Sequence, residues 1–219
     1  MAVADTAGAG VGASVTVWFD PICPWAYLGR DRTDILVDLG FTVVERPYEL
    51  HPTPAGTPPR TRPIRPGGRL DLLHREIAGL CAACGVPFRP PTTVTSTRWA
   101  LELTEVVRAH DPGSHAAVVA DLFTARFVDD VDLGDPHAVA DRLTALGLDT
   151  ARLMARTGAG DGTDRVDRSM DEARALGITA TPGWAFPTGF VLTGVHDREQ
   201  MARWGRRLLG RSSGGRPST

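Results

Sequence analysis

The 219-residue sequence contains no lysine and no asparagine, so every basic side chain other than histidine is an arginine. This bias is typical of a GC-rich coding sequence and is a weak indication of an actinobacterial source, not of any chemistry. The formal net charge is only −2, and no apolar run reaches the length of a membrane span. The sequence therefore predicts no general attraction to nucleic acid or membranes, which leaves small molecules and proteins as partners.

Cysteine is also scarce, with three residues in the chain. Residues 1–13 are small and rich in glycine and alanine, and they lack the basic start and apolar core of a secretory signal. We therefore expect residues 1–13 to be a disordered tail and the protein to be cytoplasmic. In a reducing cytosol a cysteine is kept for its reactivity or its packing, and not as a structural disulfide.

Cys23 lies at the junction of an expected strand and an expected helix. Residues 15–19 are β-branched and aromatic, which favours a strand, and Pro24 suits the first turn of a helix. A thiol at a helix N-terminus faces unpaired backbone N–H groups and the positive end of the helix dipole, and both favour the thiolate. We therefore expect Cys23 to be a nucleophile of lowered pKa. The alternative is a small buried residue at a strand end.

The motif Cys23-Pro24-Trp25-Ala26 resembles that of the thioredoxin-fold DsbA family. Within that family it is similar to the FrnE-like and 2-hydroxychromene-2-carboxylate isomerase-like branch, whose motif is Cys-Pro-Trp-Cys or a variant. Because position 26 is alanine, Cys23 cannot close a disulfide within its own motif. A second block, residues 125–136, resembles the FrnE-like pattern of an aromatic helix end, an acidic turn and Asp-Pro, so the resemblance covers most of the chain.

The first fifty residues predict a βαβ unit. Residues 25–39 have apolar side chains at helical spacing and stop at Gly40, and residues 41–50 alternate weakly as a second strand. This order predicts two parallel strands with the helix on one face. Cys23 would then lie at the carboxyl end of its strand, the edge where open α/β sheets bind ligands.

Residues 51–68 are rich in proline and are expected to be a loop without regular structure. Because the loop leaves the carboxyl end of the second strand, it should lie near Cys23, where Arg60, Arg62 and Arg65 would bind a carboxylate or phosphate. A solvated connector is the alternative to such a lid. His51 is the best-placed histidine for proton transfer, although a histidine at a strand end is more often structural or solvated.

Residues 70 to about 154 have a helical pattern throughout and predict a helical insertion. Cys81-Ala82-Ala83-Cys84 falls inside its first helix, where cysteines three apart share a face but bond poorly unless the turn unwinds. Packing is therefore favoured over a redox or zinc site for this pair. Neither a second cysteine pair nor a histidine cluster at ligand spacing predicts a metal.

The last third of the chain predicts a helix at residues 164–176 and another at residues 198–209, capped by Asp197. The resemblance implies that Thr181-Pro182 is a cis-proline loop packed against Cys23, followed by two antiparallel strands at residues 184–187 and 190–193. It also implies that the backbone of Thr181 pairs with a substrate that carries a thiol or a disulfide.

The expected fold class is α/β: a thioredoxin-like fold with a helical insertion between its βαβ half and its ββα half. The thioredoxin-like domain would comprise residues 14–68 and 162–210, the inserted helical domain residues 69–161, and a second disordered tail residues 211–219. Cys23 and His51 are the expected catalytic residues. The residues expected to bind substrate or thiol are Pro24, Trp25, Tyr27, Arg60, Arg62, Arg65, Thr181, Pro182 and Trp184.

The leading hypothesis is a cytoplasmic, DsbA-like enzyme with a single active-site cysteine. It would act on a small, aromatic organic molecule of specialised metabolism, as an oxidoreductase or as a thiol-dependent isomerase. No covalently bound cofactor is expected, but glutathione or mycothiol would bind beside Pro182 in the isomerase. The alternatives are a monothiol oxidoreductase of protein or mycothiol disulfides, and a ligand-binding thioredoxin-fold protein without catalysis. The helical insertion and Trp18, Trp25 and Trp184 favour an apolar aromatic ligand over an extended polypeptide.

Overall fold

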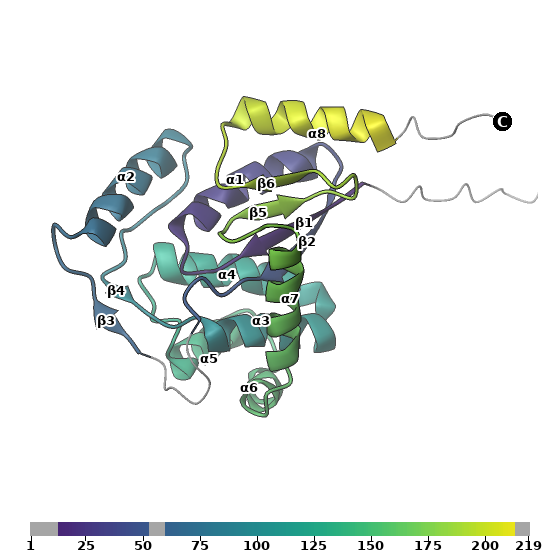
Figure 1. The fold of residues 1–219 in the computed structure, drawn as a ribbon. Helices are drawn as coiled ribbons and strands as arrows, with labels where there is room; N and C mark the ends of the chain where they lie inside the picture. Colours follow the sequence, from purple (N-terminus) through teal and green to yellow (C-terminus); the bar gives the residue numbers. More distant parts are fainter. Residues whose placement is uncertain (1–12, 53–59, 213–219) are drawn as a thin grey trace, which may run out of the picture.

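A four-stranded mixed sheet organises the computed structural model, which describes residues 13–52 and 60–212 (Figure 1). Its strands are β1 (Ser14–Phe19), β2 (Thr42–Pro47), β5 (Gly183–Ala185) and β6 (Val191–Thr193), in the order β2-β1-β5-β6. β1 and β2 are parallel, whereas β5 is antiparallel to both β1 and β6. Val17 of β1 lies between Glu45 and Trp184, so the two halves of the chain share one sheet. This arrangement confirms the expected fold class.

Helices cover both faces of the sheet (Figure 1). α1 (Pro24–Asp38) joins β1 to β2 and packs with α8 (Arg198–Ser212) on one face. It ends where Gly40 adopts a φ of +99°, a conformation that favours glycine. α7 (Thr163–Ala175) lies on the opposite face, where Ser169 Oγ donates to the carbonyl of Pro47 at 2.7 Å.

The region between β2 and α7 is mostly helical. It contains α2 (Arg69–Ala83), α3 (Arg98–His110), a short 3-10 helix η1 (Pro112–Ser114), α4 (His115–Phe127), α5 (Pro136–Ala145) and α6 (Thr150–Gly158). Two short strands, β3 (Arg62–Pro63) and β4 (Thr93–Val94), pair antiparallel. The expectation of no regular structure over residues 51–68 is therefore wrong at β3, because its partner strand lies on the far side of α2 in the sequence.

An aromatic cluster joins this helical region to the sheet. The ring of Tyr27 in α1 lies 5.1 Å from that of Phe127 in α4, and Phe127 in turn lies 5.3 Å from Phe88. The hydroxyl of Tyr27 donates to the carbonyl of Pro87 at 2.6 Å. These residues belong to one continuous hydrophobic core that runs from Trp18 to α7, so the insertion holds its position relative to α1 through shared packing.

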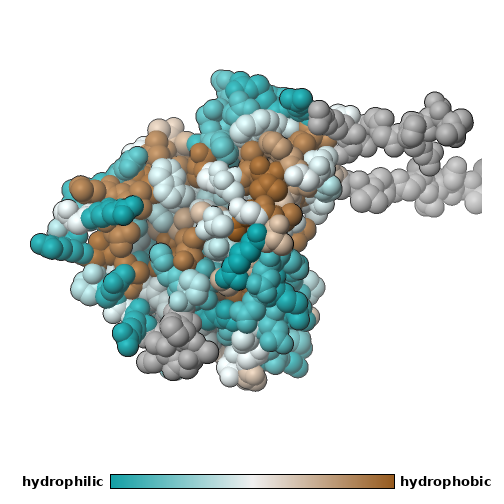
Figure 2. Space-filling view, in the orientation of Figure 1, coloured by the Kyte–Doolittle hydropathy of each residue, from teal (hydrophilic) through white to brown (hydrophobic). Residues whose placement is uncertain are grey.

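α2 is less deeply packed than its neighbours and projects from the body of the molecule beside β3 and β4 (Figure 1). Its exposed large apolar residues are Leu70, Leu72 and Leu80. Figure 2 shows apolar side chains gathered on the same side of the molecule. Among the described residues, no helix is both long enough and apolar enough to cross a membrane. The predicted tails, residues 1–13 and 211–219, lie mostly outside the described residues. The predicted start of the second tail is wrong, because α8 continues through Arg211 and Ser212.

Candidate active site

The Cys23 side chain lies between the N-terminus of α1 and the loop before β5. Cys23 is the N-cap of α1, and its Sγ accepts a hydrogen bond from the backbone N–H of Ala26 at 3.4 Å. The thiol donates to the carbonyl oxygen of Thr181 at 3.3 Å, although the two residues are 158 apart in sequence. The Thr181-Pro182 peptide bond is cis, which is the conformation implied by the resemblance.

Gly29 lets the proline loop approach α1 closely. A Cβ atom at this position would lie 2.8 Å from Cγ of Pro182, too close for a non-bonded contact between carbons. Beyond it, the indole of Trp184 is fully buried and donates to the hydroxyl of Thr33 at 3.1 Å. The direct packing of α1 on Pro182 therefore holds Thr181 against the Cys23 thiol.

Burial controls the protonation of Cys23. The side chain is 5% exposed, and its desolvation raises the pKa of the thiol to about 11. The contacts with Thr181 and Ala26 lower the pKa, but by less than burial raises it, and the nearby Asp20 carboxylate raises it further. The expectation of a lowered pKa is therefore wrong: the helix N-terminus acts as predicted, but the loss of hydration outweighs it. At neutral pH Cys23 is a protonated hydrogen-bond donor.

Asp20 is a fully buried carboxyl group at the end of β1. Its oxygens accept hydrogen bonds from the backbone N–H groups of Ile22, at 3.1 Å, and Leu50, at 2.8 Å. Burial raises its pKa to about 6 against the effect of these hydrogen bonds. The carboxyl therefore joins the turn before Cys23 to the segment after β2. An acidic residue directly behind an apolar strand is the sequence signal for this group, and the motif around Cys23 does not by itself indicate it.

A cavity of about 190 Å³ opens beside Cys23. Its walls come from the start of α1, the segment after β2, α2, β4 and the end of α4, so the helical region supplies the wall opposite the sheet. Most of its lining is apolar: Ile22, Pro24, Trp25, Leu50, Leu70, Leu73 and Val94. The remaining lining residues are Cys23, His51, His74, Thr93 and Arg126. The thiol thus lies between the proline loop and a small, largely apolar space.

Residues 14–203 match the sequence model of the DSBA-like thioredoxin domain, which is most of the chain. The chain belongs to the DSBA-like thioredoxin family. Members of this family, including a disulfide reductase and 2-hydroxychromene-2-carboxylate isomerase, are oxidoreductases or isomerases. No curated protein sequence matches the chain as a relative.

Solved structures of this DSBA-like fold resemble the chain at low sequence identity. A probable DsbA oxidoreductase from Streptomyces coelicolor superposes with a TM-score of 0.78 at 21% identity, covering 94% of this chain and 92% of that one. A 2-hydroxychromene-2-carboxylate isomerase gives 0.69 at 20% identity, covering 94% and 100%. The cytosolic disulfide reductase DsbM from Pseudomonas aeruginosa, solved with glutathione, gives 0.64 at 17% identity, covering 91% and 97%. These likenesses establish the shared fold.

The structure places the predicted site residues of this DSBA-like chain in three groups. Cys23, Pro24, Trp25 and the exposed His51 line the cavity, while Thr181 and Pro182 contact the opposite side of the thiol or its helix. The rings of Tyr27 and Trp184 are packed in the core behind the site and do not line this cavity. Arg60, Arg62 and Arg65 are exposed and are not among the described residues that line the cavity. An anion-binding role for these three arginines stays a prediction without a contact to support it.

Two residues that line the cavity, Arg126 and His74, were not predicted from the sequence. Arg126 is three, four and seven residues after Phe123, Leu122 and Val119, all of which are buried, so it lies on the apolar face of α4. A charged residue on the buried face of a helix was the available signal, but residues 125–136 were interpreted only by their resemblance to the family pattern.

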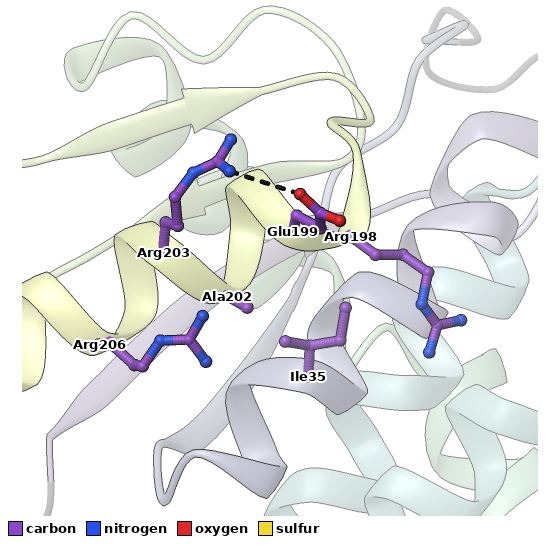
Figure 3. Close-up of a pocket in the computed structure, with 6 residues that line it drawn as sticks. All are labelled: Ile35, Arg198, Glu199, Ala202, Arg203 and Arg206. Carbon is purple, nitrogen blue, oxygen red and sulfur yellow. Dashed lines mark ion pairs between the residues drawn. The ribbon is translucent and has the colours of Figure 1, made fainter.

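A second hollow, of about 500 Å³, lies between α1 and α8 (Figure 3). Its lining residues are Ile35, Arg198, Glu199, Ala202, Arg203 and Arg206, and Glu199 pairs with Arg203 at 3.5 Å. Ile35 lies roughly 16 Å along α1 from Pro24, given a rise of about 1.5 Å per residue. This surface groove is therefore separate from the Cys23 site.

Proposed function

We propose that this DSBA-like protein is a cytoplasmic enzyme with a single active-site cysteine that acts on a small, aromatic organic molecule of specialised metabolism. The observation that carries the proposal is the setting of Cys23, whose thiol has Ala26 in place of a partner cysteine and borders an apolar cavity of about 190 Å³. An apolar cavity of about 150 Å³ holds benzene, so this space is suited to a one-ring molecule and not to a polypeptide segment.

The protonated state of Cys23 favours thiol-dependent isomerisation over direct attack on a disulfide. A thiol whose pKa burial raises to about 11 is mostly protonated at neutral pH, and its S–H already donates to Thr181. Its one S–H, turned away from the Thr181 carbonyl, would donate a hydrogen bond to the sulfur of a bound low-molecular-weight thiol, whereas disulfide attack requires the thiolate. Cys23 would thereby position that sulfur at the mouth of the cavity.

The residues beside the thiol fit glutathione or mycothiol. The backbone of Thr181 is the candidate partner, because its carbonyl already accepts from the Cys23 thiol at 3.3 Å and would accept from a polar group of such a molecule next to Pro182. When bound, the thiol supplies a nucleophilic sulfur. Two structural relatives support this proposal by their names: an isomerase of 2-hydroxychromene-2-carboxylate, and a disulfide reductase solved with glutathione.

Serine and alanine variants of Cys23 separate the two chemistries. If Cys23 acts as a hydrogen-bond donor, Cys23→Ser should keep part of the glutathione- or mycothiol-dependent isomerisation of aromatic enones, and Cys23→Ala should lose it. If Cys23 attacks disulfides, both variants should lose reduction of protein or mycothiol disulfides completely. Cys84→Ser, which alters a half-buried thiol at the end of α2, is the matched control and should leave either activity intact.

The assay result decides between the candidates. Isomerisation that survives in Cys23→Ser supports the proposal, whereas efficient disulfide turnover lost in both variants supports the monothiol oxidoreductase. Binding of an aromatic ligand without either activity would identify a ligand-binding protein that has kept the fold alone.

A further inference from the structure

The pair Cys81 and Cys84 at the end of α2 carries thiol chemistry that the Cys23 site does not use. Cys81 is fully buried, whereas Cys84 is the C-cap residue of the helix and is half-buried. Arg32, which contacts Cys84, lies roughly 13 Å along α1 from Cys23, given a rise of about 1.5 Å per residue. The pair is therefore a site of its own.

The last turn of α2 brings the two side chains to one side of the helix. The backbone N–H of Cys84 donates to the carbonyl of Cys81 at 3.0 Å, an i→i+3 bond, and Gly85 follows with a φ of +70°. Such a bond tightens the turn toward 3-10 geometry, in which side chains three apart eclipse. Cβ atoms three apart on a helix are separated by about 5–6 Å, and a disulfide needs about 3.5–4.5 Å, so a movement of about 1–2 Å closes the bond.

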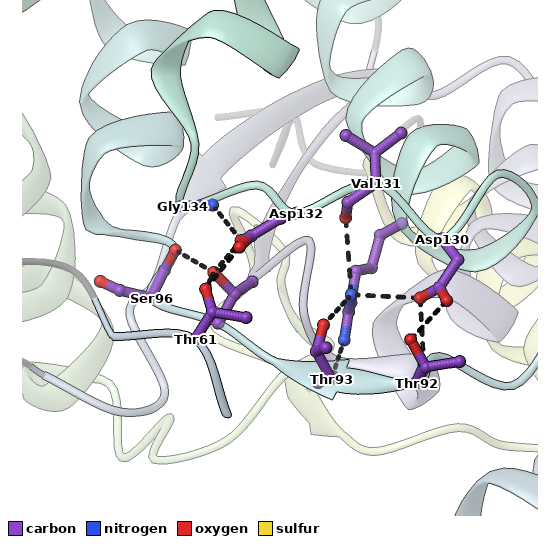
Figure 4. A network of polar contacts seen from close by, with 10 residues as sticks. Thr61, Thr92, Thr93, Ser96, Asp130, Val131, Asp132 and Gly134 are labelled. Atoms are coloured by element: carbon purple, nitrogen blue, oxygen red, sulfur yellow. Dashed lines mark hydrogen bonds and ion pairs between the residues drawn. The ribbon is translucent and has the colours of Figure 1, made fainter. Parts of the chain in front are cut away.

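α2 is held less firmly than the short β3–β4 ribbon beside it. The ribbon is fixed by polar contacts: Nη2 of Arg126 donates to the carbonyl of Thr93, and Asp130 accepts from the backbone N–H of Thr92 at 3.0 Å (Figure 4). Within the described ranges, by contrast, no side chain of residues 72–83 forms a hydrogen bond or an ion pair with another element. The last turn of α2 can therefore shift with only the contact of Cys84 to Arg32 at stake.

A buried guanidinium places positive charge beside Cys84. Nη1 of Arg32 donates to the Cys84 sulfur at 3.4 Å and to Asp31 at 2.8 Å, and Nε donates to the carbonyl of His196 at 2.9 Å. Asp31 also accepts from Arg198, so two guanidinium groups share one carboxylate. Positive charge beside a partly exposed sulfur is the setting in which reactive cysteines are found.

Cys81 is suited to the second step of an oxidation and not to the first. Burial raises the pKa of its thiol to about 11, and charge on Cys84 raises it further, whereas Arg32 lowers it. Cys81 is therefore protonated at neutral pH and shielded from reagents, but it is close to any modified sulfur at Cys84.

We propose that Cys84 and Cys81 form a second thiol site that hydrogen peroxide oxidises, with Cys84 reacting first and Cys81 closing a disulfide. A small oxidant is favoured over a bulky disulfide because the Cys84 sulfur is half-buried. The inference does not depend on the proposed function, which concerns Cys23.

The oxidation proceeds in two balanced steps. The Cys84 thiolate attacks one oxygen of the peroxide, the O–O bond breaks, and the departing hydroxide takes up a proton to leave as water, which gives a sulfenic acid at Cys84. The Cys81 sulfur then attacks the sulfenic sulfur, the S–S bond forms, and the hydroxyl leaves with the Cys81 proton as a second water. The two thiols lose one electron pair, which reduces one peroxide to two waters.

Peptide-resolved mass spectrometry of the full chain tests the inference. Cys81 and Cys84 fall in one tryptic peptide, residues 76–98, because trypsin does not cleave between Arg89 and Pro90, and Cys23 falls in another. After treatment with hydrogen peroxide at pH 7.5 and alkylation of the remaining thiols, peptide 76–98 should lose two hydrogens as an internal disulfide. We expect this at least tenfold faster than oxidation of Cys23, and reversal by dithiothreitol.

Variants assign the order of the two sulfurs. Cys81→Ser should stop at a sulfenic acid on Cys84, which dimedone traps, and Cys84→Ser should slow oxidation of Cys81 at least tenfold. Arg32→Gln should slow disulfide formation about tenfold. Arg30→Gln is its matched control, because Arg30 lies on the same helix but pairs with Glu45 at 3.0 Å, and it should leave the rate unchanged. If Arg32→Gln does not fold, since it also loses its other contacts, the two cysteine variants carry the test.

Three results would overturn the inference: no internal disulfide in peptide 76–98, oxidation of the pair no faster than that of Cys23, or oxidation of Cys81 at the wild-type rate in Cys84→Ser. All are measured without an organic substrate. They therefore stand apart from the assays of the proposed function, which can fail while the disulfide still forms, or succeed while it does not.

Discussion

Alkylation of Cys23 should be slow at neutral pH and should accelerate with pH well beyond the range of an ordinary cysteine. Burial raises the pKa of this thiol from 9.0 to about 11. At pH 7 the thiolate fraction is then about one in 10⁴, compared with about one in 10² for a cysteine of ordinary pKa. Because the thiolate is the nucleophile, we expect an alkylation rate about a hundredfold below that of the same cysteine in the unfolded chain.

The measurement is the rate of iodoacetamide labelling at each cysteine, resolved by peptide mass spectrometry between pH 6.5 and 10. The rate at Cys23 in the folded protein should rise about tenfold per pH unit up to about pH 10. Cys84 should label faster than Cys23 at pH 7, because Cys84 is half-buried and Cys23 is buried. The urea-unfolded protein provides the reference rate for Cys23.

Asp20→Asn provides an internal check on the cause. The Asp20 carboxylate raises the pKa of Cys23, so its removal should lower that pKa and speed labelling at Cys23 while leaving Cys84 unchanged. A labelling rate at Cys23 that levels off below pH 8, or that exceeds the rate at Cys84 at pH 7, would refute the reasoning. It would show that the N-terminus of α1 lowers the pKa of Cys23 by more than burial raises it.

Three further outcomes are expected. Burial raises the pKa of Asp20 from 3.8 to about 6, so the stability linked to its protonation is present below pH 3.8 and is lost as the pH rises through 6. The free energy of unfolding of the wild type relative to Asp20→Asn should therefore fall by about 2 kcal/mol between pH 4 and 7.5. A difference that stays constant with pH in denaturant melts would contradict this. Gly29→Ala should destabilise the protein by about 1–3 kcal/mol in thermal melts and reduce Cys23-dependent activity, because its Cβ meets Pro182. The control is Gly79→Ala, in open space on α2, which should instead stabilise the protein by roughly 0.5–1 kcal/mol. Ala26→Cys should gain dithiol activity in insulin reduction, because the backbone nitrogen of residue 26 lies 3.4 Å from the Cys23 sulfur and the new thiol would be on the same turn of α1. A variant that neither gains activity nor forms a disulfide between Cys23 and the introduced thiol would speak against this role for the motif.

The sequence by itself determined the order and the ends of most elements, because the signals for them are local. Pro24 starts α1, Gly40 ends it, and Asp135 caps α5 through a hydrogen bond to the N–H of His137 at 2.9 Å. The family resemblance correctly implied the cis peptide bond at Thr181-Pro182 and the hairpin of β5 and β6 that follows it. Each of these features depends on a few neighbouring residues or on a family motif, and both can be read along the chain.

Only the tertiary structure decided the chemistry of the site, because burial and charge contacts depend on segments far apart in the sequence. The helix N-terminus that would lower the pKa of Cys23 is local, whereas the burial that raises it depends on α1, the Thr181 loop and the remaining core meeting around one sulfur. Likewise, the position of Arg126 on the apolar face of α4 does not show that this residue lines the Cys23 cavity, and the sequence does not show that the arginines of the proline-rich loop are exposed and lie outside its lining. The free energy of a charge depends on its hydration and its partners, and folding sets both.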